Sequence, residues 1–168
     1  ETGGKDFIFV HPSANAEEVA NAAFCGAFEF QGQKCSAASR MYAPKSLWND
    51  ILEGIRRRAD EVSMGDVCDF DNFINAVIDE TSFDNISSYI EYAKAAPDAE
   101  IVVGGKCDKS KGYFVEPTVI QTSNPHFKSI EEEIFGPVLT VYVYEDADLE
   151  EAIKLCDTTS PYGLTGAV

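Results

Sequence analysis

Short apolar runs that suit β-strands alternate with helical patterns along almost the whole chain, and this alternation most constrains the fold. The strongest strand signal is residues 137–145, PVLTVYVYE, which are rich in Val, Tyr and Thr. Residues 146–159 follow at once as an amphipathic helical pattern, with acidic side chains in the first turn where the helix dipole favours them. This alternation predicts an α/β domain with a largely parallel sheet flanked by helices.

The other elements are predicted from the same two periodicities. Asn15 followed by Glu18 resembles a capping box, which begins a helix that reaches Phe28. Ser46 is expected to cap the next helix, which reaches Val62. A third helix is expected over residues 79–96, before Pro97, and residues 64–73 are expected to form a loop. The remaining strands are expected at residues 6–10, 39–44, 100–105, 112–122 and within 162–168.

The charge balance argues against two classes of partner. The 168 residues carry a net charge of −16, whereas nucleic acids and anionic membrane surfaces are bound by basic patches. The dense basic run, residues 56–58, lies in a helical pattern and is expected to be balanced by Glu53, Asp60 and Glu61. No stretch approaches the 18 or so apolar residues of a membrane span, and no signal peptide is recognisable. We therefore expect neither a nucleic-acid partner nor a membrane partner.

The cysteines suggest neither a disulfide framework nor a metal site. There are five of them, at positions 25, 35, 68, 107 and 156, and no Cys-x-x-Cys pair occurs. A zinc site is therefore not expected, and a reducing compartment fits best.

Cys35 differs from the other cysteines because it lies in a run of small and polar residues, FEFQGQKCSAASRMYAP, residues 28–44. Lys34 adjoins it, and residues 36–39 could start a helix whose first amides face the sulfur; both would favour the nucleophilic thiolate. The alternative is a small buried hydrophobe, as many free cysteines are. A cysteine peptidase would need a histidine partner, and neither His11 nor His126 is marked as one.

Two carboxylate segments are further candidates. Glu1 precedes Gly3 and Gly4, where a turn could present it as a general base, although a solvated glutamate is the simpler interpretation. Residues 131–138, EEEIFGPV, pass directly into the strongest strand. A carboxylate there could accept hydrogen bonds from sugar hydroxyls and Phe135 could press on a flat ring; otherwise the segment is a charged loop with Phe135 in the core.

The segments ETGGK, GQKCSAASR, EEEIFGPVLTVYVYE and SPYGLTGAV occur in this order along the whole chain, with Cys35 34 residues after Glu1. In this order and spacing they resemble the NAD(P)-dependent aldehyde dehydrogenase superfamily. Within it, FEFQGQKCSAASRMYAP, NAVIDETSF, VGGKCDKSKGYFVEPTV and TSPYGLTGAV most resemble the pyrroline-5-carboxylate (glutamate-semialdehyde) dehydrogenase subfamily of proline catabolism.

The resemblance implies a role for each candidate residue. Cys35 would be the nucleophile, forming a thiohemiacetal and then a thioester with the aldehyde, and its backbone N–H would be one oxyanion donor. Glu1 would be the general base that activates water. Glu133 would hold the nicotinamide ribose of the NAD cofactor, and Phe135 would lie beside the nicotinamide. Ser36 would meet the carboxylate of the substrate.

The resemblance also implies that residues 1–168 are a fragment, truncated at both ends, of the thiol-containing catalytic domain. The nucleotide-binding domain and the C-terminal segments would lie outside it, and the isolated fragment would be inactive. The parent would be a homo-oligomer acting on a small aldehyde, located in the mitochondrial matrix of a eukaryote or otherwise in the cytoplasm. Two alternatives stay open: an aldehyde dehydrogenase with a different aldehyde substrate, and a non-catalytic interaction or assembly domain.

Overall fold

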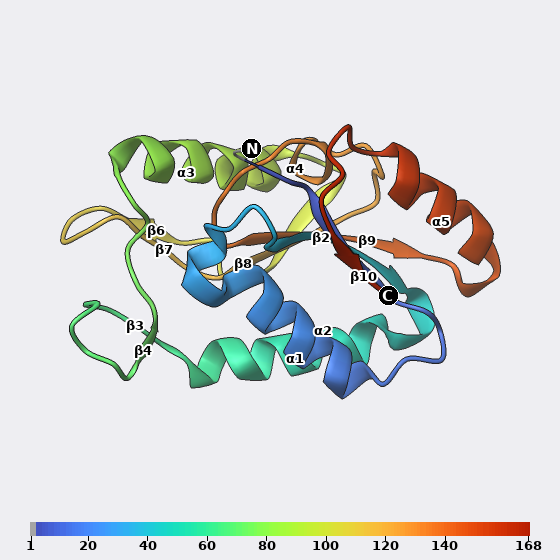
Figure 1. The fold of residues 1–168 in the computed structure, drawn as a ribbon, viewed down its shortest axis with the longest axis horizontal. Helices are drawn as coiled ribbons and strands as arrows, with labels where there is room; N and C mark the ends of the chain where they lie inside the picture. Colours follow the sequence, from blue (N-terminus) through green and yellow to red (C-terminus); the bar gives the residue numbers. More distant parts are fainter. Residues whose placement is uncertain (1–2) are drawn as a thin grey trace.

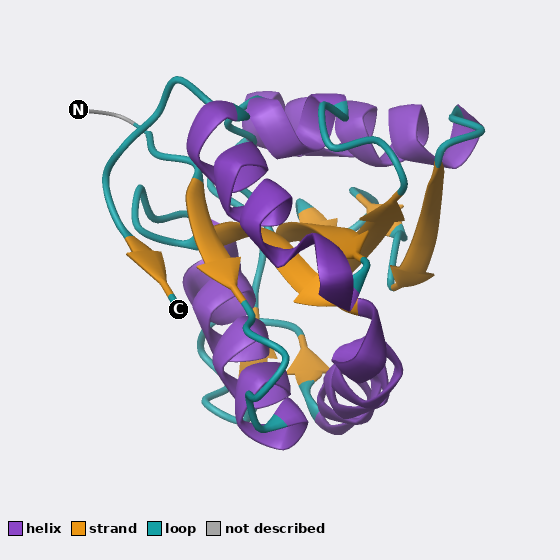
Figure 2. Cartoon of the chain, turned by 90° about the vertical axis from the view of Figure 1, so that its right-hand side faces the viewer, coloured by secondary structure: helices purple, strands orange, loops and turns teal. Residues whose placement is uncertain are grey.

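The expected alternation of strands and helices is present as three layers in the computed structural model, which describes residues 3–168. A six-stranded sheet lies between two groups of helices (Figures 1 and 2). The strand order is β10-β1-β2-β9-β8-β5, and every neighbouring pair is parallel except β5 with β8. The predicted α/β class and largely parallel sheet are therefore confirmed.

The elements follow the predicted ranges closely. The strands of the main sheet are β1 (Asp6–Phe9), β2 (Ala38–Pro44), β5 (Ala99–Val103), β8 (Thr118–Thr122), β9 (Val138–Tyr144) and β10 (Gly166–Ala167). The helices are α1 (Ala16–Phe28), α2 (Lys45–Glu61), α3 (Glu80–Ala95), α4 (Lys128–Glu131) and α5 (Leu149–Thr158), with single 3₁₀ segments η1 (Glu29–Gly32) and η2 (Asp146–Asp148).

The two faces of the sheet carry separate apolar cores. Figure 1 shows α1 and α2 below the sheet and α3, α4 and α5 above it. Successive side chains of a strand point to opposite faces. Met41 of β2 and Val141 of β9 accordingly pack with α1 and α2, whereas Tyr42 and Tyr144 pack with α5. Both faces are covered, which explains why the central strands are apolar on both sides.

Helices α1 and α2 pair closely on one face. Asn15 caps α1 as expected, because its side chain accepts hydrogen bonds from the N–H groups of Glu17 and Glu18. The sequence predicted the ion-pair partners of the basic run on α2 only in part. Arg56 pairs with Glu53 as expected at 3.4 Å, but the next two arginines reach across to α1 and bind Glu17 at 2.5 and 2.7 Å.

Three other expectations need correction. Ser46 does not cap α2, since the helix begins at Lys45 and the Ser46 N–H and hydroxyl both bond to Asp146. The predicted strand 112–122 is two strands, β7 (Phe114–Val115) and β8, because Pro117 between them has no N–H for a ladder. The loop at 64–73 is bounded by a short parallel pair, β3 (Ser63–Met64) and β4 (Asn72–Ile74), while β7 pairs with β6 (Cys107–Asp108).

Among residues 3–168, none of the helices combines the length and the apolar character that a membrane crossing requires.

Candidate active site

The three candidate motifs meet because each precedes a parallel strand. Gly3 and Gly4 come before β1, Cys35 before β2 and Glu133 before β9. Strand β2 is the neighbour of both β1 and β9, with Asp6 opposite Ala38 and Arg40 opposite Thr140. Since parallel strands all begin at one edge of the sheet, the segments that lead into these strands lie at that same edge.

Gly4 joins the motifs physically. Its backbone N–H donates a 3.0 Å hydrogen bond to Oε1 of Glu133. A Cβ placed on Gly4 would lie 2.5 Å from the backbone oxygen of Cys35, a distance at which something must shift. Gly3 is similarly close to Glu133, since a Cβ on it would lie 3.1 Å from Cγ of that residue. The double glycine thus lets the first segment fit between the cysteine loop and the glutamate.

Two loops at this edge hold backbone conformations that side chains rarely adopt. Phe30 and Gln31 have φ values of 54° and 57°, and Phe135 has a φ of 60°. The loops contact each other at Gly32, where an added Cβ would lie 2.3 Å from the backbone oxygen of Gly136. Conformations of this kind cost on the order of 1–3 kcal/mol each and cluster at functional sites. They mark this edge of the sheet as a candidate site independently of the motifs.

An open pocket of about 550 Å³ lies at the same edge. Glu133, Phe135 and Gly3 line one part of it, Tyr162 lines another, and the rest comes from the start of α3 and the residues just before it. A volume of this order suits a ligand of small-molecule size. Both predicted cofactor-binding residues, Glu133 and Phe135, therefore line one pocket.

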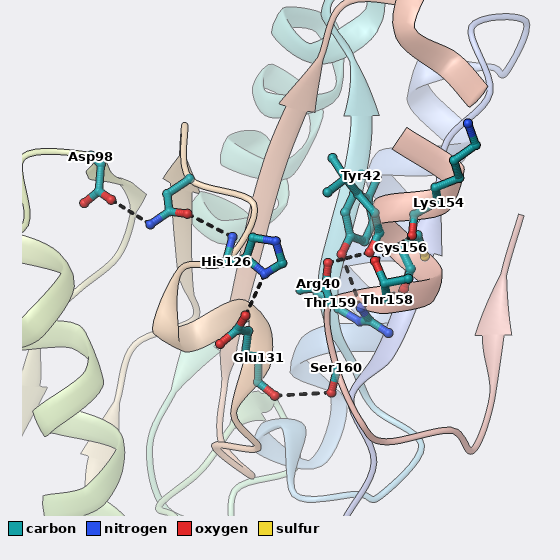
Figure 3. Close-up of polar contacts among 12 residues, drawn as sticks. Arg40, Tyr42, Asp98, His126, Glu131, Lys154, Cys156, Thr158, Thr159 and Ser160 are labelled. Atoms are coloured by element: carbon teal, nitrogen blue, oxygen red, sulfur yellow. Dashed lines mark hydrogen bonds and ion pairs between the residues drawn. The ribbon is translucent and has the colours of Figure 1, made fainter. Parts of the chain in front are cut away.

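The segment that contains Glu131 and Glu133 is held by hydrogen bonds at both residues. Upstream, the His126 ring forms a 2.8 Å hydrogen bond with Glu131, and the Ser160 hydroxyl donates to the Glu131 backbone oxygen at 3.2 Å (Figure 3). Glu133 itself is half-buried, and burial raises the pKa of its carboxyl group, against the opposing effects of the Gly4 N–H and of the charge on Lys5. The carboxylate is therefore fixed and partly desolvated.

Cys35 lies in an exposed turn, and one part of its predicted environment was wrong. Residues 36–39 do not start a helix; the chain enters β2 at Ala38, so helix amides do not face the sulfur. The ammonium of Lys34 forms an ion pair with Glu29 at 2.5 Å. The cysteine is nevertheless accessible, unlike Cys156, which is buried in α5.

The structure says less about the two remaining predicted site residues, Ser36 and Glu1. Ser36 is exposed beside Cys35, and its predicted contact with a substrate carboxylate stays a prediction. Glu1 lies outside the described residues, so its role as a general base also stays a prediction.

Sequence reasoning missed one residue of this site. Lys5 is 1% exposed, although lysine is almost never buried without a partner. A usable signal was present in the sequence, because Lys5 directly follows the double glycine and directly precedes the apolar strand, where a solvated lysine is not expected.

Comparison with known proteins decides the family. A family model described as the aldehyde dehydrogenase family matches residues 1–168, which is the whole chain. The chain belongs to the aldehyde dehydrogenase family. The resemblance that the motifs carried is thereby confirmed.

Individual relatives show which enzymes of this family the chain resembles. The chain is 60% identical over 168 residues to the mitochondrial delta-1-pyrroline-5-carboxylate dehydrogenase of Dictyostelium discoideum and 48% identical over 169 residues to that of Homo sapiens. In each case the match covers 100% of this chain and 30% of the relative. Among solved structures, the NAD-bound enzyme from Mycobacterium tuberculosis is 42% identical, with a TM-score of 0.89 over 99% of this chain and 30% of that one. The chain thus spans about 30% of the length of these relatives.

Proposed function

We propose that residues 1–168 are the thiol-containing catalytic segment of a longer NAD-dependent aldehyde dehydrogenase, and that its substrate is L-glutamate γ-semialdehyde. The observation that carries the proposal is the position of Gly4, which bonds to Glu133 and packs against the Cys35 backbone. It brings the proposed nucleophile and the proposed cofactor contact to one edge of the sheet. The names and identities of the relatives support the choice of substrate.

The residues of the pocket suit the nicotinamide end of NAD. Glu133 presents a half-buried carboxylate with one oxygen already bonded to Gly4, so the carboxylate can accept hydrogen bonds from ribose hydroxyls. Phe135 lines the same pocket and offers a flat apolar ring. Bound NAD would supply the hydride acceptor that the oxidation of an aldehyde requires.

The chain's own groups would perform the remaining steps. The Cys35 thiolate adds to the aldehyde carbon, forming a C–S bond, while the carbonyl oxygen takes the negative charge next to the Cys35 N–H. After oxidation the carbon is a thioester. Glu1 takes a proton from water, the resulting hydroxide attacks the thioester carbon, and the C–S bond breaks to release the acid and regenerate the Cys35 thiolate, after which Glu1 gives its proton to solvent. A thioester suits this sequence because its carbonyl is readily attacked by water.

The same relatives suggest the setting of the parent protein. The relatives from Dictyostelium discoideum and Homo sapiens are named mitochondrial. A eukaryotic parent is therefore assigned to the mitochondrial matrix, and any other parent to the cytoplasm. A homo-oligomeric parent remains part of the proposal.

Steady-state NADH formation by the full-length protein tests this function. Wild type, Cys35→Ala and Cys25→Ala are compared with glutamate semialdehyde and a panel of short aliphatic and aromatic aldehydes. Cys25 is a matched control because it is also an exposed free cysteine. We expect preference for the semialdehyde, a loss on the order of a thousandfold or more in kcat for Cys35→Ala, and no change for Cys25→Ala.

Other outcomes would contradict specific parts. Turnover of the panel but not of the semialdehyde would keep the mechanism and overturn the substrate. Turnover that survives Cys35→Ala would overturn the mechanism, and a wild type inactive on every aldehyde would favour a non-catalytic role.

A further inference from the structure

Lys5 is a buried lysine whose terminal amino group is unsatisfied. Its side chain is 1% exposed, and within residues 3–168 its Nζ has no hydrogen-bond partner. Its backbone is fixed, since its carbonyl oxygen accepts a 2.7 Å hydrogen bond from Nε of Arg40. Arg40 is itself tied to the end of α5 through the Cys156 carbonyl oxygen at 3.0 Å (Figure 3). Burying a charge in this way is costly unless a nearby charge of opposite sign compensates for it.

The compensating charges come from the glutamate segment. Burial lowers the pKa of Lys5 to about 7; Glu133 opposes this effect most strongly, Arg40 adds to it, and Glu132 opposes it more weakly. Asp6, the next residue along the chain, also acts on the carboxyl group of Glu133. Of these groups, Glu133 is the one whose carboxylate is anchored by the backbone N–H adjacent to Lys5 in the chain.

The charge on Lys5 therefore favours the ionised form of Glu133. One carboxylate oxygen is held by Gly4, and the side chain lines the open pocket. A half-buried carboxyl group resists ionisation unless an opposite charge lies close by. An uncharged carboxyl group accepts hydrogen bonds more weakly than a carboxylate.

We propose that Lys5 is a positioning residue for cofactor binding: its buried ammonium keeps Glu133 ionised and oriented toward the pocket, ready to accept the ribose hydroxyls of NAD. The inference rests on the proposed function and deepens it. Lys5 acts through Glu133 and does not touch the cofactor or the aldehyde.

The test measures NAD affinity directly, by titration of the full-length protein without aldehyde between pH 6 and 9. The variants are Lys5→Met, which keeps the length of the side chain and removes the charge, and Glu133→Gln. Lys106→Met is the matched control, because the Lys106 side chain is 86% exposed and meets only Glu116, at 3.7 Å, among the ion pairs of the described residues. Alkylation of the Cys35 thiol and a thermal unfolding curve report whether each variant is folded.

The expected result is specific to the cofactor. Lys5→Met weakens NAD binding at pH 6.5 by roughly tenfold, as removal of a charged partner does, and raises KM for NAD more than it lowers kcat. The deficit of Lys5→Met relative to wild type is largest at the acid end of the range and shrinks as the pH rises through about 7, because wild-type Lys5 then loses its proton. Glu133→Gln weakens NAD binding at every pH in the range, whereas Lys106→Met behaves as wild type.

The two proposals fail in different ways. If Glu133→Gln binds NAD as wild type does, the cofactor site itself is wrong. If Glu133→Gln weakens binding but Lys5→Met has wild-type affinity and pH dependence, only the role of Lys5 is wrong. If Lys5→Met does not fold, the comparison of wild type with Glu133→Gln decides: a pH dependence that persists without the Glu133 carboxylate overturns the inference.

Discussion

At the scale of single residues, Gly4 is the position on which the candidate site most depends. The space for its side chain is occupied by the backbone oxygen of Cys35, 2.5 Å from an added Cβ, and backbone cannot move aside as a flexible side chain can. We predict that Gly4→Ala displaces the cysteine loop and lowers kcat for aldehyde oxidation by about tenfold or more, since small misplacements of reacting groups cost that much.

Gly26→Ala is the control for this prediction. A Cβ on Gly26 makes only an ordinary 3.5 Å contact with Ala38, and Gly26 lies inside α1, where alanine is favoured by about 0.5–1 kcal/mol. Steady-state kinetics and thermal unfolding of both variants check the pair. Equal activity of Gly4→Ala and Gly26→Ala would show that the close approach at Gly4 is unimportant.

The buried Lys5 also predicts how stability varies with pH. Burial lowers its pKa from 10.5 to about 7 in the folded protein, so between these pH values the unfolded chain binds more protons than the folded one. Stability contributed by this group therefore rises with pH through that window, by roughly a few kcal/mol in total. We expect the free energy of unfolding of wild type, relative to Lys5→Met, to rise between pH 7 and 10 in urea titrations. A difference that stays constant would show that burial does not lower the pKa of Lys5 in the folded protein.

Residue roles that depend on neighbours in the sequence could be predicted, whereas roles that depend on contacts between distant segments could not. The pattern of small residues after Cys35 was compatible with a helix start, but pairing with β1 and β9 draws residues 38–44 into a strand. Ser46 has the chemistry of a cap, but Asp146, 100 positions away, takes its hydroxyl. Lys5 was overlooked although its position between the double glycine and an apolar strand was a usable signal.

At the scale of elements, α1 and α2 cross so closely that a glycine is required. A Cβ on Gly54 would lie 2.6 Å from Cβ of Ala20 on the other helix. We predict that Gly54→Leu separates the helices and lowers the free energy of unfolding by about 1–3 kcal/mol, as overpacking does. Ala22→Leu on the exposed face of α1 is the control and is expected to stay near neutral. Urea midpoints check both, and unchanged stability of Gly54→Leu would contradict the close crossing.

Most elements could be predicted because their periodicities are strong. Strand β9 can be predicted from its β-branched and aromatic residues, and α1 from its Asn15 cap and apolar stripe. The division of residues 112–122 into β7 and β8 was missed, because alternation continues across Pro117 even though the ladder cannot. The antiparallel direction of β5 is likewise set by pairing with β8 and not by its own residues.

At the scale of the whole molecule, the position of the site departs from a general rule. In open α/β sheets, ligands usually bind outside the carboxyl ends of the parallel strands. Here Gly4, Cys35 and Glu133 all precede their strands, so the candidate site lies at the amino ends. Pattern reasoning about the fold alone would have pointed to the opposite edge; the prediction of these residues comes from the order and spacing of the motifs.

The size of the chain relative to its relatives carries a prediction about activity. It spans about 30% of the length of the relatives, and the described pocket at the site is open. We predict that the isolated 168-residue chain forms no NADH from NAD and glutamate semialdehyde above a blank without enzyme. The full-length protein assayed in parallel is the control. Turnover by the isolated chain would contradict the proposal that it is only one segment of the active enzyme.

The central claim is that Cys35 carries the acyl group. The most direct measurement mixes the full-length Glu1→Gln variant with NAD and glutamate semialdehyde, quenches in acid and analyses tryptic peptides by mass spectrometry. Trypsin cuts after Lys34 and Arg40, so Cys35 lies in residues 35–40, apart from the other cysteines. The account predicts an acyl adduct on that peptide that accumulates in Glu1→Gln and turns over in wild type. An adduct on another cysteine, or product formation with no adduct on residues 35–40 in either protein, would contradict it.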